Sequence, residues 1–426
     1  MIQRINGIDG MEELEKILNR TQMDSPEVLQ RVDQILDDVR LRGDSALLEY
    51  TKMYDGHELE NLRVTREEIE EARENIDPGL RKAMENAIEN ITRFHKNQVD
   101  QGFIVQEDDI LLGQLVNPIE RVGIYVPGGT ASYPSTVMMN VIPANLAGVR
   151  EIVIATPAGK DGRIRDSVLV AADLLGVTDI FKMGGAQAVG ALCYGTETIR
   201  KVDKIVGPGN IYVAMAKRKV SGMVGIDMIA GPSEVVVLAG EGANPRYIAA
   251  DLIAQAEHDQ RAASIVVTDS DSLAGRIEQE LSRQLMELAR WEIAEKALAD
   301  YGALIVVDSM EEGFHIVNRL APEHLELLTE NPLEDYKRIR NAGAIFLGEY
   351  TPEPVGDYYA GPNHTLPTSR TARFSSALGV EDFCKKTSLI YYSKEALEKA
   401  SGDIMTLARD EALTGHANSI RVRMED

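Results

Sequence analysis

Two polar residues close an amphipathic stretch near the middle of the chain. From Pro245 to His258, apolar residues recur at helical spacing, which predicts a helix. Gln255 and His258 are three residues apart, so an amide oxygen and an imidazole share one edge of that helix. Such a pair is half of a metal site or of a polar binding wall, although it is more often an ordinary solvated edge. The choice depends on whether the chain supplies further ligands.

An acid and a histidine follow Pro322 directly. Because proline suits the first turn of a helix, Glu323 and His324 are expected at a helix N-terminus. The positive end of the helix dipole favours ionised Glu323 and disfavours protonated His324. Two bases near neutral pH would suit proton abstraction and the activation of water. The alternative is an acidic residue at a helix N-terminus beside a partly buried histidine.

Asp357 and His364 are ligand-type residues in a long irregular segment. Residues 348–380 are rich in Pro, Gly, Ser and Thr and show no clear periodic element. A loop of that length within a compact protein is usually functional or disordered. Asp357 is equally suited to forming a turn.

Glu411 and His416 lie near the C-terminus, five residues apart. On one continuous helix they would point roughly 140° apart, so they can meet one ligand only if the chain turns, and Gly415 is the expected place. One amide oxygen, two imidazoles and one carboxylate, without a thiolate, suit zinc with open positions for substrate, while manganese or cobalt remain possible. This ligand set is Gln255, His258, Asp357 and His416.

Length, charge and cysteine content limit the classes of protein to which the chain can belong. At 426 residues, the chain is long enough for more than one compact unit. A formal net charge of -23 makes sequence-independent binding to nucleic acid improbable. Cys193 and Cys384 lie far apart without CxxC spacing, which favours a reducing compartment. No signal sequence or membrane-length apolar run is visible, so we expect a cytoplasmic protein that binds no membrane.

Alternating strand and helix patterns predict the fold class. Residues 1–110 read as helices with solvated charged faces, and His57 and His95 are expected among their exposed polar residues. From residue 121, short apolar strands lead into turns and helices, which predicts an α/β fold with parallel sheets whose ligands bind at the carboxyl ends of the strands. The turns are Pro127-Gly128-Gly129, Thr156-Pro157-Ala158-Gly159, Gly184-Gly185-Ala186-Gln187 and Gly207-Pro208-Gly209-Asn210.

These turns leave nucleotide binding open. None of them spells GxGxxG, so the usual dinucleotide fingerprint is missing. Glycine-rich turns that open helices can still hold a pyrophosphate through backbone N–H groups, but they also occur as plain structural turns.

Changes in pattern divide the chain into segments. Residues 1–20 are expected to form an N-terminal helical segment, and 126–233 an inserted α/β domain that would be the one to bind a nucleotide if its turns do so. Residues 21–125 and 234–378 are assigned to a larger α/β domain with the metal and catalytic residues. Residues 379–426 are expected to form a small C-terminal appendage. The predicted fold is therefore two Rossmann-like parallel-sheet domains lacking GxGxxG, with small helical segments at both ends.

Several motifs, in this order and at these separations, resemble the histidinol dehydrogenase family over nearly the whole chain. The most specific is Ala230-Gly231-Pro232-Ser233-Glu234. The others are Gln255-Ala256-Glu257-His258-Asp259, Ala321-Pro322-Glu323-His324-Leu325-Glu326, Val355-Gly356-Asp357 and the tail from Glu411 to Ser419. The resemblance implies a zinc-dependent, NAD-linked oxidation of L-histidinol to L-histidine through L-histidinaldehyde, in histidine biosynthesis.

The resemblance also implies roles for individual residues. Glu323 and His324 would be the acid/base pair, and Gln255, His258, Asp357 and His416 would hold zinc. Substrate would be contacted by Ser233, Gln255, His258, His324, Asp357, Glu411 and His416, with His364 near it. NAD would be contacted by Tyr125, Gln187 and Asn210. The family is a homodimer with shared active sites, so residues 379–426 would cross to the partner subunit.

Two other functions stay open from the sequence. One is a related zinc and NAD dehydrogenase for another amino or sulfonated alcohol, for which Ser233 and Glu411 are the discriminating residues. The other is a metal-stabilised binding protein without catalysis. The presence of both Glu323 and His324 argues against it, because zinc binding alone requires neither.

Overall fold

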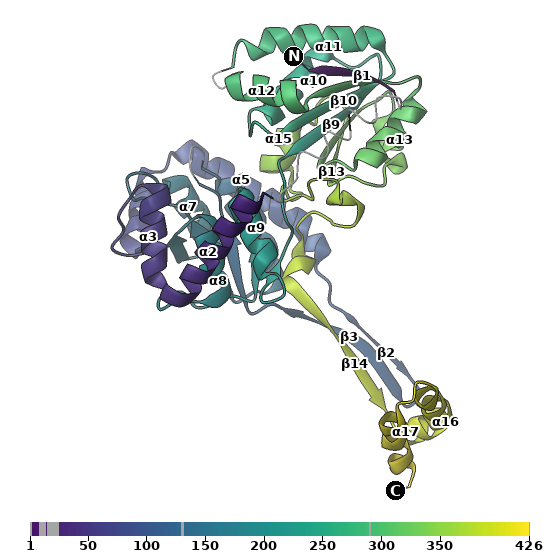
Figure 1. Cartoon of the computed structure of the whole chain (residues 1–426). Coiled ribbons are helices and arrows are strands. Elements are labelled where there is room, and N and C mark those ends of the chain that lie inside the picture. The colour runs from purple at the N-terminus through teal and green to yellow at the C-terminus, as the bar shows by residue number, and fades with distance from the viewer. Residues whose placement is uncertain (1, 8–13, 15–24, 129–131, 289–290, 426) are drawn as a thin grey trace.

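The computed structural model describes residues 2–7, 14, 25–128, 132–288 and 291–425. Two lobes lie next to each other, each a sheet with helices packed on it, and a long arm extends from their junction and carries the C-terminus (Figure 1). Among the described helices, none is both long and apolar enough to cross a membrane.

The first lobe is built on five strands: β4 (Arg121–Tyr125), β5 (Glu151–Thr156), β6 (Asp179–Lys182), β7 (Lys204–Val206) and β8 (Gly225–Ile226). They form one parallel sheet in the order β6-β5-β4-β7-β8. All five residues of β4 are buried, since helices cover both faces of the sheet, as is typical of parallel sheets.

Eight helices of this lobe are α2 (Pro26–Arg42), α3 (Asp44–Asp55), α4 (Arg66–Asn75), α5 (Pro78–His95), α6 (Pro134–Ala147), α7 (Asp166–Leu174), α8 (Gly185–Tyr194) and α9 (Ile211–Val220). They divide into two apolar cores, one on each face of the sheet. The residues of α2, α3, α8 and α9 form one core, and those of α4 to α7 form the other. Helix α2 shows why: its buried residues recur at three- and four-residue spacing.

The second lobe is built on six strands: β1 (Gln3–Asn6), β9 (Glu234–Ala239), β10 (Ala263–Thr268), β11 (Ala303–Val306), β12 (His324–Leu328) and β13 (Ala344–Leu347). They form a parallel sheet in the order β1-β11-β10-β9-β12-β13. One face is covered by α10 (Pro245–Ala256), α11 (Asp271–Leu285) and α12 (Trp291–Tyr301). The other is covered by α13 (Met310–Leu320), and α14 (Pro332–Asp335) with η4 (Tyr336–Arg338) connects β12 to β13.

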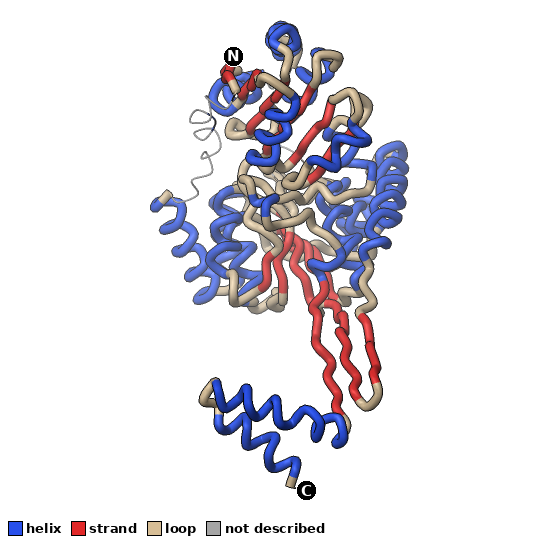
Figure 2. The backbone as a smooth tube through the Cα atoms, turned by 90° about the vertical axis from the view of Figure 1, so that its right-hand side faces the viewer, coloured by secondary structure: helices blue, strands red, loops and turns tan. Residues whose placement is uncertain are grey.

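The arm is an antiparallel sheet of β2 (Phe103–Glu107), β3 (Ile110–Pro118) and β14 (Cys384–Tyr392). Its tip carries α16 (Lys394–Asp410), α17 (Thr414–Arg421) and the short η8 (Val422–Met424). Figure 2 shows the three strands leaving the body and the two helices beyond them. Every residue of β2 is exposed, because within one chain the arm packs on no core.

Short helices fill the segment that the sequence left irregular. They are α15 (Glu353–Val355), the π-helix η5 (Gly356–Ala360), η6 (Thr371–Arg373) and η7 (Val380–Phe383), while η3 (Lys96–Gln98) follows α5. The amide of Asn90 on α5 donates to the Tyr359 carbonyl at 3.0 Å. The segment therefore bridges the two lobes.

The predicted fold class is confirmed, with two parallel sheets and helices on their faces. Three details differ. Strands β2 and β3 were not predicted from the sequence, because neither packs on a core that would impose a regular apolar pattern. Residues 21–125 were grouped with 234–378, but α2 to α5 pack on the five-stranded sheet. Within the helical segment predicted for residues 1–20, residues 3–6 form strand β1, and residues 8–13 and 15–20 lie outside the described residues.

Candidate active site

A cavity of about 360 Å³ lies where the two lobes meet. The first lobe lines it with Pro127 after β4 and with Gly207 to Ile211 after β7, at the carboxyl edge of its sheet as expected. The second lobe lines it with Ser233, Glu323 and His324, which stand at the amino ends of β9 and β12. The cavity therefore joins the carboxyl edge of one parallel sheet to the amino edge of the other.

Glu323 and His324 begin a strand, so the predicted helix is wrong. Strand β12 starts at His324, which is paired with Val235 on one side and Ala344 on the other. Helix α13 ends before it, with Ala321 in the left-handed conformation (φ 49°). Pro322 thus terminates the preceding helix. Tertiary pairing between two neighbouring strands outweighs the local preference that the proline suggested.

The protonation of the pair also differs from the prediction, because no helix dipole acts on it. Glu323 Oε2 accepts from the Glu234 N–H at 2.9 Å, yet burial raises the pKa of Glu323 to about 8. Burial alone would lower the pKa of His324, but the carboxylates of Glu353, Glu323 and Asp357 outweigh it and raise that pKa well above 6.5. His324 Nδ1 lies 3.2 Å from the Glu234 carbonyl, which fixes Nδ1 as the donor.

The free nitrogen of His324 faces two carboxylates. Nε2 is buried with no hydrogen bond, 3.6 Å from Asp357 Oδ1 and 3.9 Å from Glu353 Oε1. Ligand atoms of the three residues lie within 4.8 Å of one another, a spacing that could hold a metal ion. The neighbouring histidines, His324 first, hold the pKa of Asp357 below its usual value despite burial. Two carboxylates and an imidazole at this spacing therefore suit a bound cation.

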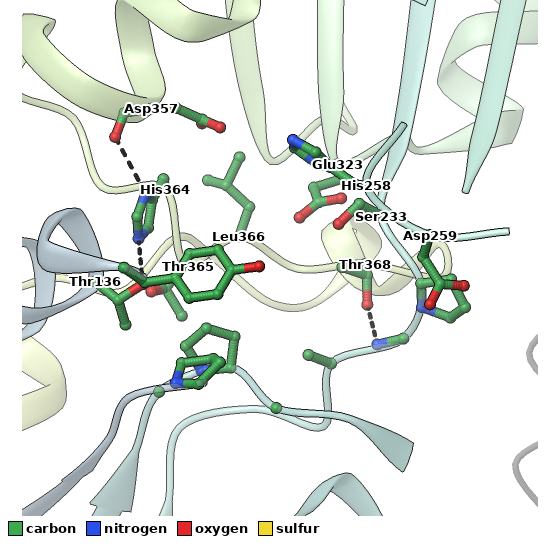
Figure 3. Close-up of a pocket in the computed structure, with 18 of the residues that line it drawn as sticks. Thr136, Ser233, His258, Asp259, Glu323, Asp357, His364, Thr365, Leu366 and Thr368 are labelled. Carbon is green, nitrogen blue, oxygen red and sulfur yellow. Dashed lines mark hydrogen bonds between the residues drawn. The ribbon is translucent and has the colours of Figure 1, made fainter. Parts of the chain in front are cut away.

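Gln255 and His258 lie on the same side of the site. Gln255 is fully buried in the last turn of α10. In the amide orientation that satisfies both ends, its nitrogen donates to Glu353 at 2.7 and 3.0 Å, and its oxygen accepts from the Glu234 N–H at 2.9 Å. His258 follows two residues after α10 ends, and its side chain lies beside Ser233 and Glu323 in the cavity (Figure 3). The charge of His258 acts on Asp357, so both belong to one electrostatic cluster.

His364 lies on the opposite wall, half-buried against the first lobe. Its Nδ1 is 3.1 Å from the Asp357 carbonyl and its Nε2 is 3.4 Å from the Thr136 hydroxyl (Figure 3). Burial lowers the pKa of His364. This side chain is therefore a neutral bridge between the irregular segment and α6.

The three residues expected to contact a nucleotide gather around turns of the first lobe. The Tyr125 hydroxyl accepts from the Gly185 N–H at 3.0 Å and is almost fully buried, as is Gln187 two residues further on. Asn210 lines the cavity and caps α9 by accepting from the N–H groups of Tyr212 and Val213. Of the three, Asn210 alone lines the described cavity, and the other two support the turn beside it.

Glu411 and His416 are not brought to the site within one chain. Both are exposed at the tip of the arm, where α16 and α17 lie far from the two lobes (Figure 1). The chain turns at residues 411–413, with Ala412 in the left-handed conformation (φ 57°), so the turn expected at Gly415 is wrong. Gly415 instead lies within α17.

Glu353 contacts two predicted site residues but was not itself predicted from the sequence to belong to the site. A usable signal was present: Glu353 precedes Asp357 by four residues, so a helical turn brings the two together. Behind it lie Glu326 and Asp251, with pKa values raised by burial to about 9 and about 6. Glu326 Oε1 accepts from the Glu353 N–H at 3.1 Å and so supports this wall.

Comparison of the sequence and the fold with known proteins points to one family. The profile of that family, described as histidinol dehydrogenase, matches residues 18–424. A histidinol dehydrogenase from Caldanaerobacter subterraneus subsp. tengcongensis is 56% identical over 410 residues, covering 96% of this chain and 95% of the relative. One from Bacillus subtilis is 52% identical over 421 residues, covering 99% and 98%.

A solved structure agrees with the whole fold. The crystal structure of histidinol dehydrogenase from Elizabethkingia anophelis superposes with a TM-score of 0.94 at 37% identity. The superposition covers 100% of this chain and 98% of that one. The match therefore extends over both lobes and the arm.

Proposed function

The chain belongs to the histidinol dehydrogenase family of oxidoreductases, and we propose that it oxidises L-histidinol to L-histidine through L-histidinaldehyde with zinc and two NAD⁺. Histidinol oxidation in histidine biosynthesis follows from the family. The metal, the cofactor and the residue roles are the proposed part. One observation carries them: a single cavity unites Glu323 and His324, the carboxylate of Asp357 and the glycine-rich turn before α9.

The proposed ligands suit zinc, but a single chain places only three of the four near the cavity. His258 and Asp357 offer an imidazole and a carboxylate, and Gln255 would offer its amide oxygen once the amide turns so that the oxygen, and not the nitrogen, faces Glu353. His416 would come from a second subunit, because its own chain places it on the distant arm tip. When bound, zinc would hold the amine and imidazole nitrogens of the substrate and offset the carboxylate charge around His324.

The residues on the cavity wall divide the proton transfers. His324 would accept the alcohol proton at Nε2, since its Nδ1 is committed to the Glu234 carbonyl. Glu323 would accept a proton from the water that attacks the aldehyde. Ser233, together with the partner subunit's Glu411, would contact the substrate. NAD⁺ would accept one hydride in each of the two oxidations, bound near Tyr125, Gln187 and Asn210.

Exposed apolar residues on the arm support a homodimer. Phe103, Ile104 and Val105 on β2 and Ile390 and Tyr391 on β14 are 48 to 70% exposed, too apolar for a free surface. A second copy that packs on the arm would cover them and receive α16 and α17. Each active site would then take Glu411 and His416 from its partner. The two cysteines are free, which accords with the proposed cytoplasmic location.

A substrate panel tests the proposal. The zinc-loaded protein is incubated with NAD⁺ and L-histidinol, a shorter amino alcohol without an imidazole, or a sulfonated alcohol, and NADH is followed by absorbance. We expect turnover of L-histidinol to exceed that of the others by about 100-fold or more, because a site built to bind polar groups is penalised when they are missing. Faster turnover of a sulfonated or other amino alcohol would favour the related dehydrogenase instead, and no NADH at any metal loading would reject both.

A further inference from the structure

A fully buried ion pair lies directly beneath the turn before α9. The side chains of Lys217, on α9, and Asp227, just after β8, are 2% and 1% exposed and form an ion pair. Burying two opposite charges costs several kcal/mol of desolvation, and a well-packed apolar pair is often as stable or more so. A gain in stability therefore does not explain why these two charged residues are buried. The explanation lies in the other groups that they contact.

Both partners of the pair bind the same glycine. Lys217 Nζ donates to the Gly207 carbonyl at 3.0 Å, and Asp227 Oδ2 accepts from the Gly207 N–H at 2.8 Å. Gly207 has φ +108°, and a Cβ there would lie 2.1 Å from the Tyr125 carbonyl oxygen. The backbone is thus held in a left-handed conformation, pressed against the end of β4, by two charge-assisted hydrogen bonds. An apolar pair could make neither bond.

The turn that starts at Gly207 forms the first-lobe wall of the cavity. Gly209, Asn210 and Ile211 line the cavity, while the Asn210 side chain caps the next two N–H groups of α9. Backbone N–H groups at a helix N-terminus suit the pyrophosphate of a dinucleotide, provided that the loop keeps its shape. The ion pair holds that turn from beneath: Asp227 is among the residues that line the cavity, but the side chains of both partners are almost inaccessible to solvent.

Asp227 also connects this wall to the other one. It begins the stretch that runs to Ser233, and much of that stretch lines the cavity. The stretch is tied to the irregular segment where the Gly231 N–H donates to the Thr368 hydroxyl at 2.6 Å. One end of this connection therefore holds the turn before α9, and the other end carries a proposed substrate residue.

We propose that Lys217 and Asp227 are positioning residues for the dinucleotide: by holding Gly207 at both its N–H and its carbonyl, they keep the Gly207–Asn210 turn in its binding shape and thereby set NAD affinity. This inference rests on the proposed use of NAD. The pair touches neither substrate nor cofactor, so its removal should affect dinucleotide affinity and leave histidinol affinity nearly unchanged.

The test compares two groups of charged residues in the first lobe. Lys217→Met/Asp227→Asn removes both charges without leaving one unpaired, and the new amide can still accept from the Gly207 N–H. Arg121→Met is the control, because the buried Arg121 forms ion pairs with the partly exposed Glu151 and Asp179 at the amino edge of the sheet, away from the cavity. Dissociation constants of NADH and of histidinol are measured on the zinc-loaded proteins, with thermal unfolding alongside.

The double variant is expected to bind NADH at least tenfold more weakly and histidinol within twofold of the wild type. Arg121→Met is expected to unfold at a lower temperature yet to bind NADH within twofold of the wild type. Unchanged NADH affinity in the double variant, or an equal loss in Arg121→Met, would overturn the inference. Failure of the wild type to bind NADH would instead reject the proposed function, and the inference with it.

A measurement on the wild type covers the case in which the double variant does not fold. Amide hydrogen exchange is followed in peptides that contain Gly207, with and without NADH. We expect slow exchange at Gly207 already in the free protein, since its N–H is committed to a buried carboxylate, and little further slowing with NADH. Rapid exchange that becomes slow only with NADH would show that the cofactor, and not the ion pair, orders the turn.

Discussion

The imidazole of His324 owes its properties to the groups around it. One nitrogen is committed to the Glu234 carbonyl, and the other faces Asp357 and Glu353 across 3.6 and 3.9 Å. From the sequence, Glu323 and His324 were a candidate acid/base pair with a structural alternative, and the family resemblance implied the catalytic role. The sequence could not give their protonation, since the pKa values depend on burial and on Glu353, which is distant in sequence.

Glu323→Gln should separate the two oxidations. Glu323 is proposed to act only on the water that attacks the aldehyde, so we expect the variant to oxidise histidinaldehyde about 100-fold or more slowly while the first oxidation is affected less. Burial raises the pKa of Glu323 to about 8, so wild-type aldehyde oxidation should rise with pH through about 8 as the carboxylate ionises. NADH formation from histidinaldehyde across the neutral and alkaline range measures both.

The matched control for this variant is Glu330→Gln, an exposed acid just beyond β12. It should leave the rate and the pH profile of aldehyde oxidation unchanged. An alkaline rise that survives in Glu323→Gln would assign water activation to another group.

His258→Asn should lower zinc affinity by about 100-fold or more while the chain stays folded, because an imidazole ligand is lost from the edge of the site. Metal content after dialysis against a chelator measures it, with circular dichroism to monitor the fold. His315→Asn is the control, since His315 is a 79% exposed side chain on α13. Stoichiometric zinc retained by His258→Asn would remove His258 from the proposed ligands.

Helices and strands could be predicted from the sequence where packing on a core imposes a regular spacing of apolar residues. Helices α2 and α5 and the buried strands followed from apolar spacing. Strand β12 could not be predicted, because Pro322 suits a helix start equally well and only its pairing with β9 and β13 decides. His95 shows the same limit: it was expected to be exposed, yet it is fully buried at the end of α5, beside Gln98 of η3, which binds the first residue of η7.

The buried His95 predicts how stability depends on pH. Its Nδ1 lies 2.7 Å from Gln98 Oε1, which also accepts from the Val380 N–H, so Nδ1 is the donor and the ring is neutral. Burial lowers the pKa of His95 below 6.5. Its contribution to the free energy of unfolding is then fully present above pH 6.5 and is lost as the pH falls toward the folded-state pKa, since the unfolded chain binds the proton first.

His95→Asn tests this dependence. At pH values above 6.5 the variant should be less stable than the wild type by about 1 to 3 kcal/mol, because a buried hydrogen bond and its packing are lost. Its free energy of unfolding should fall less steeply on acidification below pH 6.5. Urea denaturation at several pH values measures both, and parallel pH profiles for the two proteins would contradict the buried neutral histidine.

At the scale of the whole molecule, the residues proposed for the active site lie in two places that one chain keeps apart. The cavity lies between the lobes, while Glu411 and His416 lie at the tip of the arm (Figure 1). From the sequence, the detached C-terminal segment was expected, but its antiparallel sheet was not, since β2 and β3 form no local core. The proposed dimer with shared sites would account both for the exposed apolar strands and for the distance of His416 from the other proposed ligands.

Subunit mixing tests the shared site. Glu323→Gln and His416→Asn are each expected to form almost no histidine as homodimers, because each removes from every site a group that the proposed second oxidation requires. A mixed dimer has one site with both substitutions and one with neither, so equal mixing with subunit exchange should restore up to about a quarter of wild-type activity. If both groups of each site came from the same chain, mixing would restore none.

The central claim, that this cavity carries histidinol through both oxidations, is tested most directly by the yield of NADH per histidine formed. With limiting L-histidinol, excess NAD⁺ and zinc-loaded enzyme, the account predicts two NADH for each L-histidine, with no free aldehyde accumulating. One NADH per histidinol, with L-histidinaldehyde as the end product, would contradict it, because the site would then lack the water-activating step assigned to Glu323.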